Sequence, residues 1–194
     1  METYEKQEIK TIQKSRNTEA VEIDGSIFIR QINPGVIIMP YTLDEEGNPS
    51  QIGIINEILD QRSTGISKTL ITGTPDDSDS NIFQTAIREL LEESGFEVKD
   101  IKRWNFLGSL YTSKLVLNAS PCFSVNLTSL VATEDNVEKK ESDEDEDDSE
   151  KDSKFELINV DEALSIEDSL ISTLFIKTFK NLFIKSQEEN GKSE

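Results

Sequence analysis

Apolar side chains recur every three or four positions between residues 82 and 91, and polar side chains fill most positions between them. This spacing brings the apolar residues together on one side of an α-helix, where they form a stripe that packs against a core. Gly95 follows at the position where a left-handed residue commonly ends a helix. The pattern therefore predicts an amphipathic helix. Its apolar stripe consists of Ile82, Phe83, Ala86, Ile87, Leu90 and Leu91.

Strand-like segments precede this helix. Residues 19–31 place apolar residues on both sides of Asp24 and Gly25, which predicts a β-hairpin with a tight turn. Residues 42–51 form a turn-rich loop, and residues 1–16 are polar and expected to be frayed or weakly strand-forming. Short apolar runs suit buried strands. They lie at residues 36–40, 52–59 and 68–71.

Further strands and a second helix are predicted downstream. Residues 97–111 indicate two strand segments, and residues 115–131 supply more strand-forming positions. Residues 165–185 carry a wide apolar face, with Ser165 and Asp168 placed as a capping box at the start. We expect a core helix there rather than a partner-binding helix. The order of strands, helix, strands and helix indicates an α+β protein, an α/β/α sandwich around a mixed sheet.

An acidic segment, residues 134–153, interrupts this pattern. It holds twelve acidic and three basic residues, so it contributes −9 of the total charge of −19 and leaves −10 on the remainder. Such a segment cannot bury enough apolar area to offset the entropy lost on ordering. We expect a disordered surface insertion between two strands, and the alternative is a segment that loads Ca²⁺ or binds a basic partner.

Charge and residue types exclude several functions. The excess of 39 acidic over 20 basic residues opposes non-specific binding to nucleic acid or to anionic membranes. A single cysteine, Cys122, permits no internal disulfide. The absence of histidine excludes Ser-His-Asp hydrolases and His-ligated zinc sites. With no apolar run long enough to span a bilayer, we expect a soluble, cytoplasmic protein.

Three acidic side chains on the first predicted helix indicate metal chemistry. Glu89, Glu92 and Glu93 stand at positions i, i+3 and i+4, so their carboxylates lie within reach of one another. Like charges repel at this spacing unless a cation lies among them, and Mg²⁺ takes oxygen ligands from a few such carboxylates. The alternative is a solvated helix face, because charged faces are common and short motifs also match by chance.

The segment around these glutamates resembles the second half of the Nudix box, G-x5-E-x7-R-E-U-x-E-E-x-G-U, in which U is a bulky aliphatic residue. The first half departs from the pattern: Thr74 and Ser80 stand at the glycine and glutamate positions, and Gly73 lies one place early. Asp77 or Asp79 could replace the glutamate if the loop shifts by a residue. The matching positions are Arg88, Glu89, Leu90, Glu92, Glu93, Gly95 and Phe96.

The resemblance extends beyond the box, over about residues 19–184 without the acidic insertion. The N-terminal half looks like that of ADP-ribose and ADP-sugar pyrophosphatases, in which such a hairpin commonly joins a dimer. The resemblance implies an N-terminal extension with a β-hairpin (residues 1–32), a Nudix-like domain (residues 33–194) and a homodimer.

By the same resemblance, the chain is a Mg²⁺- or Mn²⁺-dependent hydrolase that cleaves the pyrophosphate of a nucleoside diphosphate derivative. Glu92 and Glu93 would be the principal metal ligands, with Glu89 a further ligand or water-orienting group. The catalytic residues would be Glu93, Glu89 and Arg88, with Arg88 anchoring the glutamates. The substrate-binding residues would be Arg62 and Gly73.

Two departures favour a rival hypothesis, a Nudix-like binding or assembly module without turnover. The first is the loss of the box glycine and glutamate at Thr74 and Ser80. The second is that residues 111–133 contain no acidic residue, although many family members supply a further glutamate from a later loop. Glu134 is the first candidate for that role. A third hypothesis is an acidic regulator that acts through residues 134–153.

Overall fold

The computed structural model describes residues 9–15, 18–58, 66–132 and 153–190. Within these ranges, seven strands form one mixed sheet with the order β10-β5-β4-β9-β8, to which β6 adds on β5 and β7 on β4. The β4–β9 pair is parallel and the other pairs are antiparallel. The strands are β4 (Val36–Leu43), β5 (Pro49–Ile58), β6 (Ile66–Thr69), β7 (Ile71–Gly73), β8 (Trp104–Leu110), β9 (Ser120–Asn126) and β10 (Lys154–Asn159).

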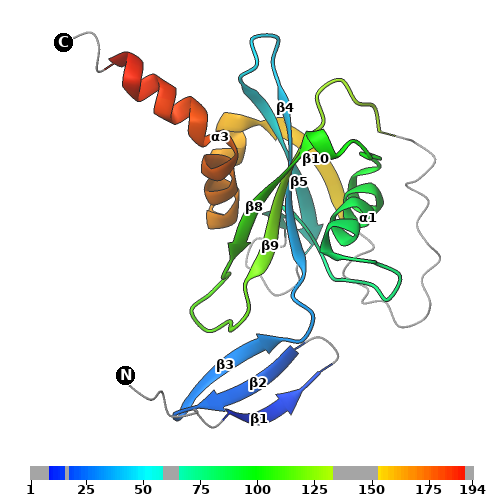
Figure 1. Ribbon diagram of the computed structural model, residues 1–194, viewed down its shortest axis with the longest axis vertical. Helices are drawn as coiled ribbons and strands as arrows, with labels where there is room; N and C mark the ends of the chain where they lie inside the picture. Colours follow the sequence, from blue (N-terminus) through cyan, green and yellow to red (C-terminus); the bar gives the residue numbers. More distant parts are fainter. Residues whose placement is uncertain (1–8, 16–17, 59–65, 133–152, 191–194) are drawn as a thin grey trace.

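Helices cover both faces of this sheet, as Figure 1 shows. Helix α1 (Ile82–Ser94) lies on one side, and α2 (Val160–Ser165) and α3 (Ser169–Asn190) lie on the other. Strand β4 runs through the middle, and its first six residues are all buried because both of its faces are covered. The predicted α+β class and α/β/α sandwich are therefore confirmed.

Each face of the sheet has its own hydrophobic core. Met39, Ile52 and Leu174 are fully buried in the core beneath α2 and α3. Ile38, Ile71 and Leu90 are fully buried in the core beneath α1. Two-sided burial of this kind supplies most of the stabilising free energy of a layered domain. It also fixes α1, which carries the predicted glutamates, against β4 and β7.

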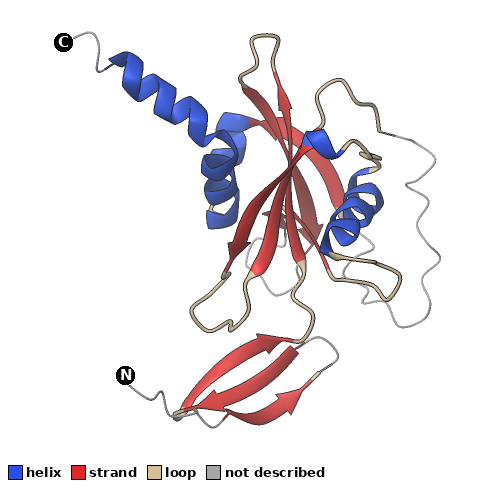
Figure 2. Ribbon diagram, viewed as in Figure 1, coloured by secondary structure: helices blue, strands red, loops and turns tan. Residues whose placement is uncertain are grey.

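The N-terminal residues form a separate three-stranded antiparallel sheet, visible as the isolated group of strands in Figure 2. The predicted hairpin is confirmed as β2 (Thr18–Ile23) and β3 (Ser26–Gln31), and β1 (Ile9–Lys14) adds a third strand. Asp24 and Gly25 both have positive φ, 50° and 76°, as a two-residue hairpin turn requires. The division of the chain at residues 32 and 33 stays a prediction.

A main-chain bridge joins this small sheet to the main body. The Ile29 N–H donates to the Leu115 carbonyl at 2.7 Å, and the Leu117 N–H donates to the Ile29 carbonyl at 2.9 Å. Ile29, in β3, thus forms an isolated parallel bridge with Val116. The loop after β8 therefore contacts β3 through the backbone.

The predicted helix at residues 165–185 is wrong at its start. The structure has two helices, because the Ser165 hydroxyl donates to the Glu162 carbonyl at 2.7 Å and so closes α2. Asp168 instead caps α3, where its carboxylate accepts the Leu170 N–H at 2.7 Å. Ser165 and Asp168 thus belong to different helix ends and form no capping box.

Residues 97–126 also differ from the prediction. One strand, β8, replaces the two expected segments, because a bulge between Phe106 and Gly108 bends it without ending it. A 3₁₀ turn (Ile101–Arg103) precedes it. Only Ser120–Asn126 of the later strand-like region forms a strand, β9. The acidic residues 134–152 and Arg62 lie outside the described residues.

Candidate functional site

Helix α1 ends at Gly95, as its sequence predicts, and a side-chain cap that was not predicted defines its start. The Asn81 side chain accepts the N–H groups of Phe83 and Gln84 at 2.9 and 3.1 Å and so caps the helix start. Gly95 adopts φ 73°, and its N–H donates to the Leu91 carbonyl at 2.9 Å. These two caps fix the length of α1 and the directions of the acidic side chains on it.

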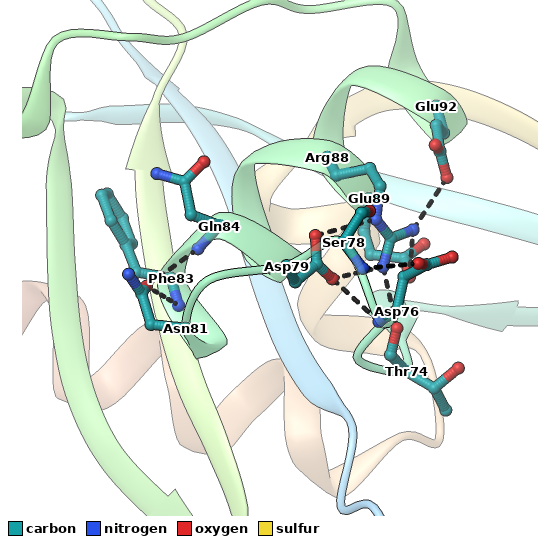
Figure 3. Close-up of polar contacts among 10 residues, drawn as sticks. All are labelled: Thr74, Asp76, Ser78, Asp79, Asn81, Phe83, Gln84, Arg88, Glu89 and Glu92. Carbon is teal, nitrogen blue, oxygen red and sulfur yellow. Dashed lines mark hydrogen bonds and ion pairs between the residues drawn. The ribbon is translucent and has the colours of Figure 1, made fainter.

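Arg88 is the centre of the polar cluster in Figure 3. Its Nη1 lies 2.9 Å from Glu89 Oε1 and 3.0 Å from Glu92 Oε2. Its Nη2 donates to the Thr74 carbonyl at 2.8 Å and to Asp79 Oδ2 at 2.9 Å, and its Nε donates to Asp79 Oδ1 at 3.3 Å. One guanidinium therefore ties the loop that precedes α1 to two glutamates of the helix.

Asp79 is the acidic residue of that loop that reaches Arg88. The loop turns at residues 76–79, where the Asp76 N–H donates to Asp79 Oδ2 at 2.9 Å and the Asp79 N–H donates to the Asp76 carbonyl at 3.0 Å. The Asp79 side chain is 7% exposed. Hydrogen bonds from the Arg88 guanidinium lower the pKa of Asp79 to about 2, so its carboxyl is ionised at neutral pH.

Glu89 lies against the main chain at Gly73. A Cβ atom at residue 73 would collide with the Cγ, Cδ and Oε1 atoms of Glu89, so the absence of a side chain there makes room for the carboxyl group. Glu89 is buried, and burial raises its pKa to about 7 against the lowering effect of Arg88. A carboxyl group in this state exchanges a proton near neutral pH.

The other two predicted ligands lie nearer to solvent. Glu92 is exposed, and Glu93, one turn after Glu89, is partly buried. Their oxygens are of the type that suits a hard divalent ion. Among the described residues, no three acidic or cysteine side chains already converge on one point as metal ligands do. In this arrangement Arg88 pairs with Glu89 and Glu92 as well as with Asp79. The assignment of Glu89, Glu92 and Glu93 as metal ligands stays a prediction.

The two residues that depart from the box pattern, Thr74 and Ser80, make different contacts. Thr74 contributes only its carbonyl oxygen to Arg88, and that contact does not depend on the side chain. The exposed Ser80 hydroxyl accepts a hydrogen bond from the Asn81 side chain at 3.3 Å and does not contact Arg88. Gly73, predicted to bind substrate, lies beside the Glu89 carboxyl, and its substrate-binding role stays a prediction.

An aromatic pocket beside the start of α1 was not predicted. It has a volume of about 290 Å³. The Phe83 ring packs edge-on against Trp104, with centroids 5.3 Å apart, and Phe106 lies 5.3 Å from Phe123. The alternation of Trp104 and Phe106 along one strand was the only available signal. The lining residues are Phe83, Ile101, Trp104, Phe106 and Phe123.

Comparisons with known proteins agree with this architecture. The NUDIX domain family model matches residues 43–178. No curated protein sequence matches the chain. No described helix is long and apolar enough to cross a membrane.

Several solved structures share the fold. A crystal structure of an ADP compounds hydrolase is 17% identical, with a TM-score of 0.54, and the match covers 96% of this chain and 98% of that one. The NUDIX domain of Shewanella oneidensis NrtR, solved with ADP ribose, is 11% identical over 76% of this chain and 86% of that one, with a TM-score of 0.51. A mutT/nudix family protein from Listeria innocua is 19% identical over 80% and 97% of the two chains, with a TM-score of 0.50. At these identities the likeness concerns the fold alone.

Proposed function

Since the chain belongs to the NUDIX domain family, we propose that it is a Mg²⁺- or Mn²⁺-dependent hydrolase that cleaves the pyrophosphate of a nucleoside diphosphate derivative. The proposed substrate class is that of ADP-ribose and nucleotide sugars. One observation carries the proposal: Glu89, whose pKa is raised to about 7, is buried on the box helix between Arg88 and Gly73.

Glu92 and Glu93 are the proposed principal ligands of the metal, and Glu89 is a further ligand or the group that orients water. A divalent ion bound there would neutralise the diphosphate and polarise its phosphorus atoms. Before a metal binds, burial raises the pKa of Glu89 to about 7, and a carboxyl group in this range is suited to accept a proton from an attacking water at neutral pH. Arg88 holds Glu89 and Glu92 in place.

The similar structures support the substrate class without establishing it. One is described as an ADP compounds hydrolase, and another contains ADP ribose. Both structural matches cover three quarters or more of this chain. Arg62 and Gly73 are the proposed substrate-binding residues. Arg62 lies outside the described residues, and Gly73 lies beside the Glu89 carboxyl.

The test is hydrolysis by the purified full chain with Mg²⁺ or Mn²⁺. The panel is ADP-ribose, NADH, nucleotide sugars and deoxynucleoside triphosphates, with products separated by chromatography. We expect cleavage of at least one diphosphate, and Glu93→Gln should lower kcat by about 100-fold or more, as loss of a group acting in the transition state does. Glu97→Gln is the control, because Glu97 lies beyond the helix and pairs with Lys99. Failure to cleave any substrate would overturn the proposal.

A second candidate function is binding without turnover. It is favoured because Glu89 and Glu92 are already paired with Arg88, and because Ser80 replaces the box glutamate. This function predicts saturable binding of ADP-ribose with no product formed. Glu92→Gln and Glu93→Gln should then leave the affinity for ADP-ribose unchanged. In a metal-dependent hydrolase both variants should instead bind the metal ion more weakly.

The proposed assembly is a homodimer joined by the N-terminal sheet. Ile27 and Ile29, two residues apart on β3, share one face of this sheet and are 59% and 38% exposed, which is apolar area that a second copy could cover. Light scattering after gel filtration should give twice the chain mass. Ile27→Lys with Ile29→Lys should give the monomer mass, and an unchanged dimer would place the interface elsewhere.

A further inference from the structure

The Arg88 guanidinium is held along one of its edges. Nε and Nη2 donate side by side to the two oxygens of Asp79, at 3.3 and 2.9 Å, and Nη2 also donates to the Thr74 carbonyl. A guanidinium bound in this bidentate way has a fixed plane and direction. The remaining nitrogen, Nη1, is then presented to Glu89 and Glu92, at 2.9 and 3.0 Å. The position of both glutamates on α1 thus depends on the aspartate of the preceding loop.

Neither of the other candidate residues of that loop takes this role. Ser80 stands at the position of the box glutamate, but its hydroxyl is exposed and bonds to Asn81. Asp77 is exposed. Asp79, by contrast, points inward because the Asp76 N–H also donates to its carboxylate. The turn at residues 76–79 therefore selects which acid faces α1.

We propose that Asp79 supplies the acidic group that the family pattern places at residue 80, and that it acts as a positioning residue for the carboxylates of Glu89 and Glu92. The substitution moves the acid one residue earlier in the chain and shortens its side chain by one carbon. The inference rests on the proposed function, because positioning has a catalytic consequence only if these carboxylates bind a metal. Asp79 itself contacts neither metal nor substrate and acts through Arg88.

The experiment compares four forms of the full chain: wild type, Asp79→Asn, Asp79→Asn with Ser80→Glu, and Asp77→Asn. Asn keeps the shape of Asp79 and removes its charge. Ser80→Glu restores an acid at the family position. Asp77→Asn is the matched control, since it removes the same charge from the same loop. The first readout needs neither metal nor substrate: solvent exchange of the Arg88 Nε–H, followed by nitrogen-15 NMR at neutral pH.

We expect a slowly exchanging Arg88 Nε–H in wild type and Asp77→Asn, loss of that protection in Asp79→Asn, and its return in the double variant. Mn²⁺ affinity, measured by titration, should fall about 10- to 100-fold in Asp79→Asn, the usual effect of removing a group that orients ligands. The double variant should recover most of that affinity. The kcat of hydrolysis should likewise fall in Asp79→Asn, recover in the double variant and stay at the wild-type value in Asp77→Asn.

The proposal would be overturned if Asp79→Asn kept the wild-type exchange rate and Mn²⁺ affinity. It would also be overturned if Asp77→Asn lost as much Arg88 protection and Mn²⁺ affinity as Asp79→Asn, or if Ser80→Glu restored neither of them. A purely structural role for Asp79 would lower thermal stability without rescue by Ser80→Glu. If wild type binds no metal and cleaves nothing, the proposed function fails. The exchange measurement still decides whether Asp79 holds Arg88 and whether an acid at residue 80 can replace it.

Discussion

The carboxyl group of Glu89 occupies the space that a side chain at Gly73 would need. The two residues belong to different elements, β7 and α1. Because the atoms in the way are the outer atoms of a side chain, a Cβ at residue 73 would displace the carboxyl before it moved the backbone. Gly73 is therefore expected to act on the site through Glu89.

Gly73→Ala is expected to lower the free energy of unfolding by about 1–3 kcal/mol, the usual cost of overpacking. It should lower hydrolysis by a larger factor, because the displaced carboxyl loses its contact with Arg88. Denaturant unfolding and kcat measurements check the two effects. In a Glu89→Ala background the same substitution should cost almost nothing. An equal loss of unfolding free energy in both backgrounds would show that the new Cβ collides with atoms other than those of Glu89.

The stability of the protein should depend on pH through Glu89. Burial raises its pKa from 4.5 to about 7, so the folded state holds the proton more tightly than the unfolded chain does. The contribution of Glu89 to the free energy of unfolding is therefore largest below pH 4.5 and decreases as the pH rises to about 7. Above that pH the contribution has been lost and no longer changes. The full difference is on the order of 1–3 kcal/mol.

Glu89→Gln cannot ionise and should remove this dependence. Chemical unfolding at pH 5 and pH 8 checks it: we expect the variant to gain stability relative to wild type at pH 8 and to gain little at pH 5. Glu97→Gln should behave as wild type at both values. A variant that is less stable than wild type at pH 8 would show that the pair with Arg88 outweighs burial.

Cys122 provides a reporter of unfolding. Its thiol is fully buried on β9 and donates to the Ser120 carbonyl at 3.3 Å, and burial raises its pKa. Because the thiolate is the reactive form, we expect a thiol reagent at pH 8 to modify the native protein more slowly than the denatured protein, by a factor on the order of 1,000 or more. Absorbance of the released reagent product measures both rates. Rapid labelling of the native chain would reveal local opening of β9.

The sequence predicted α1 well because several independent signals coincide in it. Its apolar stripe, the cap at Gly95 and the box residues all specify the same helix. The start of the last helix was misplaced because Ser165 and Asp168 have the spacing of a capping box. In the structure Ser165 closes α2, Asp168 caps α3, and the extended backbone of Ile166 separates the two helices.

The site was predicted less completely than the helix that carries it. Spacing alone placed Glu92 within reach of both Arg88 and Glu89, because it follows them by four and three residues on one helix. It could not choose between Asp77 and Asp79, since that choice depends on a turn whose hydrogen bonds involve the backbone of Asp76. The raised pKa of Glu89 likewise depends on the burial created by the β7–α1 contact, which no local pattern encodes.

The bridge between Ile29 and the loop after β8 has an evolutionary consequence. Its two hydrogen bonds use only amide and carbonyl atoms, so they place almost no demand on which side chains stand at Ile29, Leu115 and Leu117. Relatives could replace all three residues and keep the same junction. Proline at position 29 or 117 is the exception, because each of these residues donates one of the two amide hydrogens of the bridge.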